Sequence, residues 1–174
     1  MILREQWTVD LSKSNRGEDF RKEVFVRRTE QQVPEDLDEY IKSDNGVLAR
    51  PIAGKDCSQI LYKDLDPNPG SVVLDFSRGE VASKDPACET NQSVEKPDEV
   101  WKITYDPQVH QPLSIQVQSE NSVSTFDFKE GKLMSAELYW QTSLYRNCKQ
   151  HLLRTGDENT WNYRFWMDDI HLSL

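Results

Sequence analysis

The sequence is poor in the residues that most catalytic and cofactor-binding motifs need. Its 174 residues include only seven glycines, and neither a phosphate-binding glycine loop nor a G-x-S-x-G nucleophile motif occurs. Its longest apolar runs, such as residues 72–74, are far too short to cross a bilayer or to serve as a signal peptide. The sequence motifs therefore assign no enzyme class, and we expect no membrane association.

Cysteine is also scarce. Cys57, Cys88 and Cys148 form an odd set without C-x-x-C spacing, and the three histidines do not lie at zinc-ligand spacing. Reduced thiols in a cytoplasmic protein are the simplest interpretation. We therefore expect three unpaired cysteines, a cytoplasmic location and no metal site.

Basic residues are outnumbered by acidic ones. The chain has 21 Lys and Arg against 30 Asp and Glu, which gives a formal net charge of −9. A field of that sign repels the phosphates of nucleic acids unless the basic residues cluster. The bases at 21–28 do cluster, but acidic residues are interleaved with them. We therefore expect a solvated surface there and no nucleic-acid partner.

Apolar residues make up 36% of the chain, which is low for a globular protein. The six Phe, six Tyr and five Trp compensate in part, because each ring buries a large area. Three of the tryptophans lie in the last forty residues: Trp140, Trp161 and Trp166. Because 174 residues fit one domain, we expect a single domain, 1–174, with a core built around aromatic rings.

Alternation of apolar and polar residues predicts β-structure along most of the chain. The clearest segments are 71–77, 100–105, 113–118, 133–144 and 161–172. Shorter candidates are 7–11, 23–29, 46–52, 59–63, 122–128 and 147–154. Within one segment, Leu113, Ile115 and Val117 are expected to share a buried face. Strands at this spacing predict an all-β fold, either an antiparallel barrel or a sandwich.

Two segments depart from this pattern. Residues 34–42 begin with a proline and acidic residues and predict one short helix. Their apolar side chains Leu37, Tyr40 and Ile41 share one helical face. Residues 78–97 contain almost no large apolar residue and predict a long surface loop, of the kind that often carries function.

Two polar groupings are poor candidates for a functional site. Cys148 and His151 offer a thiol and an imidazole, but at strand spacing they point to opposite faces and make a poor catalytic dyad. Asp168 and Asp169 would also face opposite ways on a strand, and could chelate a cation with His171 only from a loop.

Aromatic rings and cationic side chains are interspersed in the final strands. Rings supply stacking faces and arginine binds carboxylates bidentately, so the pattern suits a planar organic ligand that carries carboxylates. The candidate ligand-binding residues are Trp140, Tyr145, Arg146 and Arg154. On regular strands positions 140, 146 and 154 could face inward together, whereas Tyr145 would face outward. A core seam, with rings inside and charges outside, would give the same pattern and is the open alternative.

Part of this region resembles a known family. Residues 137–146 (ELYWQTSLYR), continued by Lys149 and by 152–154 (LLR), resemble a stretch of the S-type phycobiliprotein chromophore lyases, and 169–172 (DIHL) resemble the last strand of that family. Its members are lipocalin-like antiparallel barrels that carry an open-chain tetrapyrrole to a cysteine on a partner protein. The resemblance implies a lipocalin-like barrel, a bilin ligand and a partner protein. It covers the last quarter of the chain, and the N-terminal pattern of the family is not found around Trp7.

Two functional classes follow from these observations. The first is a small-ligand binding protein, a lyase-like chaperone that holds a planar carboxylate-bearing molecule such as a bilin and delivers it to a partner protein. The second is a non-enzymatic adaptor that binds another protein through an exposed β face or the 78–97 loop. The residues leave open whether the chain catalyses a reaction.

Overall fold

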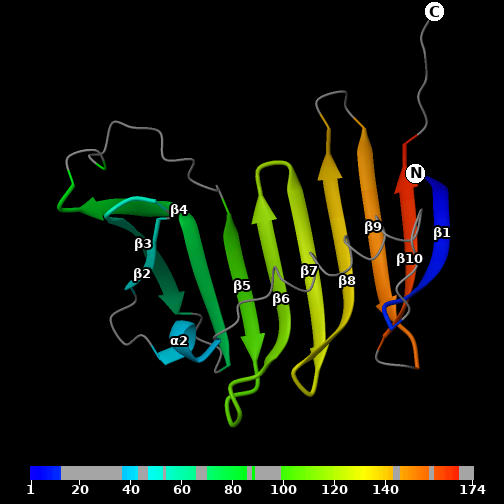
Figure 1. Cartoon of the computed structure of the whole chain (residues 1–174), viewed down its shortest axis with the longest axis horizontal. Coiled ribbons are helices and arrows are strands. Elements are labelled where there is room, and N and C mark those ends of the chain that lie inside the picture. The colour runs from blue at the N-terminus through cyan, green and yellow to red at the C-terminus, as the bar shows by residue number, and fades with distance from the viewer. Residues whose placement is uncertain are drawn as a thin grey trace, which may run out of the picture.

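The computed structural model describes residues 1–12, 37–42, 47–52, 54–65, 70–85, 88, 99–142, 146–156 and 159–168. These residues form one ten-stranded antiparallel sheet and one short helix, α2 (Leu37–Lys42) (Figure 1). The strands are β1 (Ile2–Asp10), β2 (Val47–Pro51), β3 (Cys57–Leu65), β4 (Ser71–Ser83), β5 (Val100–Tyr105), β6 (Pro112–Ser119), β7 (Ser122–Lys129), β8 (Lys132–Gln141), β9 (Asn147–Arg154) and β10 (Thr160–Met167). The predicted all-β antiparallel class is confirmed.

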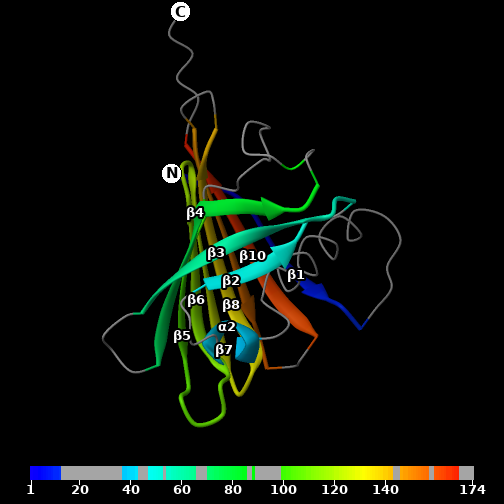
Figure 2. The ribbon, with the colours of Figure 1, turned by 90° about the vertical axis from the view of Figure 1, so that its left-hand side faces the viewer.

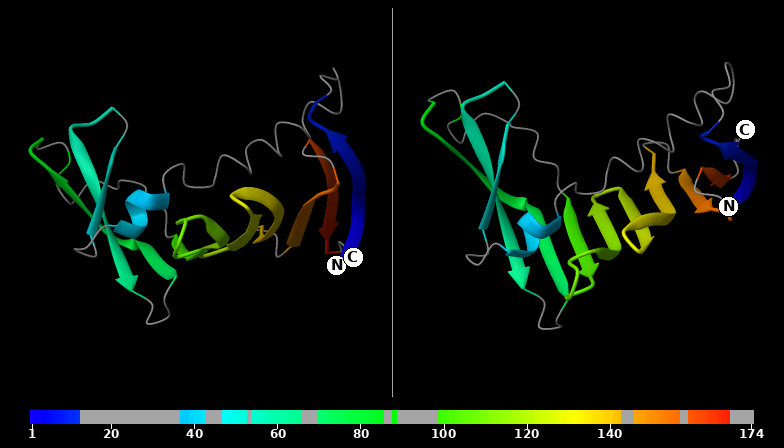
Figure 3. Two further views of the ribbon diagram at one scale, coloured as in Figure 1. Left: turned by 90° about the horizontal axis from the view of Figure 1, so that it is seen from below. Right: turned by 60° about the horizontal axis from the view of Figure 1, so that its bottom comes forward.

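The strands follow one another across the sheet in chain order, except for the first. The order is β1-β10-β9-β8-β7-β6-β5-β4-β3-β2, so β1 joins the last strand and lies at the opposite edge from β2. The described strands therefore form one curved layer that is not closed into a barrel, and α2 lies on its concave side (Figure 3). None of the helical residues described forms a helix long and apolar enough to cross a membrane.

A continuous row of side chains crosses the concave face through directly paired positions, from β4 to β1. The row is Val72, Ile103, Ile115, Phe126, Ala136, Leu152, Tyr163 and Trp7. All of them are buried except Trp7, which packs half-buried against the same cluster. Directly opposite residues in an antiparallel pair point to the same face of the sheet. This row therefore determines which residues of eight strands point to the concave side.

Three contacts hold α2 against this face. Leu37 is buried in the core cluster. The Nζ atom of Lys63 donates to the Ile41 carbonyl at 3.3 Å, and Nδ1 of His110, in the β5–β6 turn, lies 2.8 Å from the Asp38 carboxylate. A six-residue helix is not stable alone, so these contacts stabilise it. The predicted helix is confirmed over the described residues, and 34–36 lie outside them.

The predicted strands correspond to observed ones with shifted ends. The segments 133–144 and 161–172 are strands that end earlier, at Gln141 and Met167, and 7–11 is the end of a strand that begins at Ile2. The predicted strand 23–29 lies outside the described residues. At the β7–β8 turn, Glu130 and Gly131 both have positive φ, 53° and 74°. Two such residues make the type I′ turn that suits a two-residue hairpin loop.

The prediction that three apolar residues of β6 share a buried face is wrong for Leu113. Ile115 is 1% exposed and Val117 is half-buried, but Leu113 is 46% exposed. Between Thr104 and Tyr105 of β5 the register with β6 shifts, which leaves Leu113 without an opposite residue. An extra residue in a β-bulge interrupts the alternation of faces, and this position is exposed.

The predicted 78–97 loop is wrong at its start, because β4 continues as a strand to Ser83. Beyond Asp75 this strand leaves β5 and pairs only with β3, so that it runs across the direction of the other strands (Figures 1 and 2). The pairing of β3 with β4 shifts register between Ile60 and Tyr62, and the part of β4 opposite this shift contains Gly79. A Cβ added at Gly79 would lie 2.8 Å from the Ile60 carbonyl oxygen and 3.1 Å from that of Phe76. The bend thus requires a residue without a side chain. Among residues 84–97, only 84, 85 and 88 are described.

Gly79→Ala is expected to destabilise the fold by about 1–3 kcal/mol, because two of the three atoms that a Cβ would meet are backbone oxygens that cannot rotate away, and the third is Nε2 of the buried Gln59. Urea unfolding followed by tryptophan fluorescence measures the change. Ala82→Ser, an exposed change on the same strand, is the control and should lie within about 0.5 kcal/mol of the wild type. Equal stability of the two variants would show that the bend tolerates a side chain.

The prediction of three unpaired cysteines is also wrong. Cys57, at the start of β3, is bonded to Cys88, with their Cα atoms 6.2 Å apart, and Cys148 is free and buried. The β3–β4 ladder places Ser83 opposite Cys57, and a turn in which Cys88 N donates to the Asp85 carbonyl at 2.9 Å brings the second cysteine back. Spacing alone could not reveal this pairing. The expectation of a cytoplasmic location rested on reduced thiols and loses that support.

The denatured, non-reduced protein should therefore contain one titratable thiol, measured with a chromogenic disulfide reagent. Cys88→Ser should lower the free energy of unfolding by about 3–4 kcal/mol, since the bond closes a loop of 31 residues. Cys148→Ala removes a thiol without opening that loop and serves as the comparison. Three titratable thiols in freshly purified protein would contradict the bonded pair.

Candidate functional site

Aromatic side chains gather on the concave face where β8, β9, β10 and β1 lie side by side. The rings of Trp140 and Phe165 stack with centroids 6.1 Å apart and planes inclined by 18°. Both are half-buried, so part of each ring is open to a ligand. They reach the same face because Trp140 lies opposite Cys148 and Phe165 opposite Gln150, two residues further along β9.

A second ring pair adjoins the first. Trp7 of β1 and Tyr163 of β10 have centroids 4.2 Å apart. The Tyr163 hydroxyl accepts a hydrogen bond from Nε2 of Gln150 at 2.8 Å, and Nε1 of Trp7 donates to the Glu5 carboxylate at 3.4 Å. Polar atoms are therefore present within an otherwise aromatic surface, as in small-molecule sites that orient their ligand with a few polar groups.

Burial raises the pKa of Tyr163 to about 12 from its usual 10, since the charged phenolate would lose its hydration. The hydrogen bond from Gln150 opposes this shift, and the charge of Glu5 adds to it. The phenol stays protonated throughout the neutral range and can act there as a hydrogen-bond donor or acceptor.

This raised pKa predicts a loss of stability in alkali. The stability that protonated Tyr163 contributes is fully present below pH 10, where the phenol holds its proton in both the folded and the unfolded protein. It is lost between pH 10 and about 12, because Tyr163 ionises first in the unfolded chain. The loss should reach roughly 2 kcal/mol in the wild type and be absent in Tyr163→Phe. Urea unfolding of both proteins at several alkaline pH values measures the difference. Parallel curves for the two proteins would show that Tyr163 ionises normally.

Arg146 lies at the same end of the sheet as Trp140. Burial raises the pKa of the Cys148 thiol, the positive charge of Arg146 lowers it and Asp168 raises it. Arg146 comes directly before β9, where its carbonyl accepts a hydrogen bond from Thr142 N at 3.0 Å, just beyond the end of β8 that carries Trp140. The structure therefore places two of the four residues predicted from sequence, Trp140 and Arg146, at the same end of the sheet.

Arg154 is on the predicted face but at the other end of β9. Its guanidinium carbon lies 4.5 Å from the centre of the Trp161 ring, and its Nε donates to the Leu133 carbonyl at 2.7 Å. Arg154 lies six positions beyond Cys148 on the same strand, and the distance between the two residues is therefore about 20 Å. Arg154 is therefore not beside Trp140. Tyr145 lies outside the described residues.

Of the two groupings that the sequence makes poor candidates, Cys148 with His151 remains unsuitable in the structure, and Asp169 and His171 of the other lie outside the described residues. Cys148 faces inward opposite Trp140, whereas His151 faces outward opposite Glu137, so they form no dyad. Asp168 instead accepts hydrogen bonds from Asn147, which are the main reason that its pKa is lowered. Within the part of the chain that the structure describes, no group of three His, Cys, Asp or Glu could hold a metal ion.

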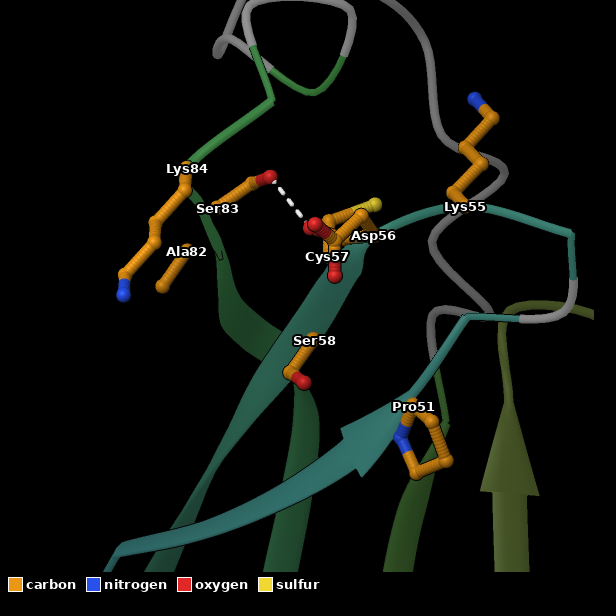
Figure 4. A pocket seen from close by; sticks show the side chains of 8 residues that line it. All are labelled: Pro51, Lys55, Asp56, Cys57, Ser58, Ala82, Ser83 and Lys84. Atoms are coloured by element: carbon orange, nitrogen blue, oxygen red, sulfur yellow. Dashed lines mark hydrogen bonds between the residues drawn. The ribbon is translucent and has the colours of Figure 1, made fainter.

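A shallow open hollow lies beside the disulfide (Figure 4). Its lining residues are Pro51, Lys55, Asp56, Cys57, Ser58, Ala82, Ser83 and Lys84. The two lysines point away from each other, and the Ser83 hydroxyl donates to the Asp56 carbonyl at 2.6 Å. No side chains converge there, so we assign no site to it.

Comparisons of the chain with protein-family models, with curated proteins and with solved structures find no match.

Proposed function

We propose that this protein binds a planar, carboxylate-bearing organic molecule, such as a bilin, on the concave face of β8, β9 and β10. The observation that carries the proposal is the half-buried stacked pair Trp140–Phe165, at the end of the sheet where Arg146 precedes β9. The rings would stack on the ligand, and the guanidinium would bind one of its carboxylates.

The architecture is compatible with this role. A curved antiparallel sheet with an aromatic inner face resembles the wall of a lipocalin-like barrel, and we propose that it serves the same purpose although its edges β1 and β2 do not pair. Together with the resemblance of residues 137–154 to the S-type lyases, this supports a chaperone that passes its ligand to a partner protein.

The compartment is proposed from the disulfide. Disulfides persist where the surroundings are oxidising and are rare in the cytosol. Cys57 and Cys88 are only 6% and 2% exposed, so the bond is shielded from soluble reductants. We therefore favour an oxidising compartment over the cytoplasm.

The adaptor alternative is favoured by a different observation. Leu3 and Leu153 are 46% and 41% exposed, and both lie on the convex face. Leu3 lies opposite the half-buried Trp166 on this face, and a group of exposed apolar side chains marks an interaction site.

Biliverdin, added to the purified protein, is expected to shift its visible absorption band and to quench tryptophan fluorescence. Arg146→Ala should weaken binding by about 1.5–3 kcal/mol, the value of a hydrogen bond to a charged group. Trp140→Ala should weaken it by roughly 1 kcal/mol or more through the lost stacking.

Matched controls come from the convex face. Arg164→Ala and Trp166→Ala remove the same side-chain types from the outer surface of β10 and should leave the affinity for biliverdin unchanged. Absence of any band shift in the wild type, or equal losses in the inner and outer variants, would refute the concave site.

A further inference from the structure

The convex face of β8, β9 and β10 carries opposite charges placed symmetrically about the middle strand. Glu137 of β8 lies opposite His151 of β9, which lies opposite Arg164 of β10. Glu137 is half exposed and Arg164 is exposed. Glu137 and Arg164 therefore lie on the strands on either side of β9, both level with His151.

The neighbouring row on this face repeats the symmetry with aromatic rings. Tyr139 lies opposite Lys149, which lies opposite Trp166. The Lys149 Nζ bonds to Glu137 at 3.0 Å and lies 5.7 Å from the centre of the Trp166 ring, so these side chains lie on one surface. Leu153, which is exposed, lies on the same face of β9, two residues beyond His151.

A two-fold axis parallel to β9 would place two such faces together. This operation exchanges the positions of β8 and β10, so Glu137 faces Arg164 of the second copy, and Arg164 faces Glu137 of that copy. Tyr139 and Trp166 meet in the same way. Each contact then occurs twice, as a two-fold interface requires.

The residues on the axis tolerate meeting their own copies. Leu153 meets Leu153, an apolar contact. Burial lowers the pKa of His151 below its usual 6.5, with Glu137 opposing and Lys149 and Arg164 assisting, so the two facing imidazoles are uncharged at neutral pH. Each Lys149 is already neutralised by Glu137 of its own chain.

We propose that two copies of this chain pair through the convex face of β8–β10. A second copy places each Arg164 opposite the Glu137 carboxylate of the other chain, which then lies between that guanidinium and Lys149 of its own chain. Tyrosine, tryptophan and arginine are also the residue types that dominate protein interfaces. The inference is independent of the concave ligand site.

Sedimentation velocity of the full chain over a concentration series tests this pairing. The wild type should form dimers, and Arg164→Glu should weaken the dimer about tenfold or more, since it sets two carboxylates opposite each other. Combining Arg164→Glu with Glu137→Arg exchanges the charges and should restore dimerisation. Lys102→Glu makes the same charge change on an exposed position of β5 and should leave the dimer intact.

Circular dichroism and thermal melting check that each variant keeps the native fold. A wild type that is monomeric at several hundred micromolar would overturn the proposal. Equal dimerisation of Arg164→Glu and the wild type, or a charge-exchanged variant that remains monomeric, would overturn the pairing of Glu137 with Arg164.

Discussion

The cross-sheet row of buried side chains on the concave face is the constraint on which the rest of the structure depends. From Val72 to Tyr163 the row passes from strand to strand through directly opposite positions. Side chains alternate strictly along a strand, so a slip of one residue would turn a whole strand's apolar set to water. The row therefore sets both faces of every strand that it crosses.

Both proposed surfaces follow from that parity. On β9, for example, the even-numbered residues Cys148 and Gln150 face inward, and Lys149 and His151 face outward. The inner set meets the Trp140–Phe165 pair, while the outer set meets Trp166 and Arg164. A single strand thus contributes to a candidate ligand site on one side and to a candidate dimer interface on the other.

The region that departs from this regularity is the end of β4. The row ends at Val72, near the start of β4; further along, the register with β3 is interrupted over the segment that contains Gly79, and the chain is tied back to β3 by the Cys57–Cys88 disulfide. With little apolar burial between Ser77 and Ser83 to hold this extension, a covalent bond and a ladder to one neighbour stabilise it. The low apolar content that predicted a loop was a true property of the sequence, but pairing with β3 made it a strand.

The sequence by itself determined most of the described strands and their parity, because the period-2 pattern is local and each apolar residue has one favourable face. It also placed Trp140 and Arg154 on the same face and excluded the Cys148–His151 dyad. Only the tertiary structure decided which residues meet: the bulge that exposes Leu113, the disulfide, and the separation of Arg154 from Trp140. Those outcomes depend on register shifts and on neighbours distant in the chain, and a local pattern carries no information about either.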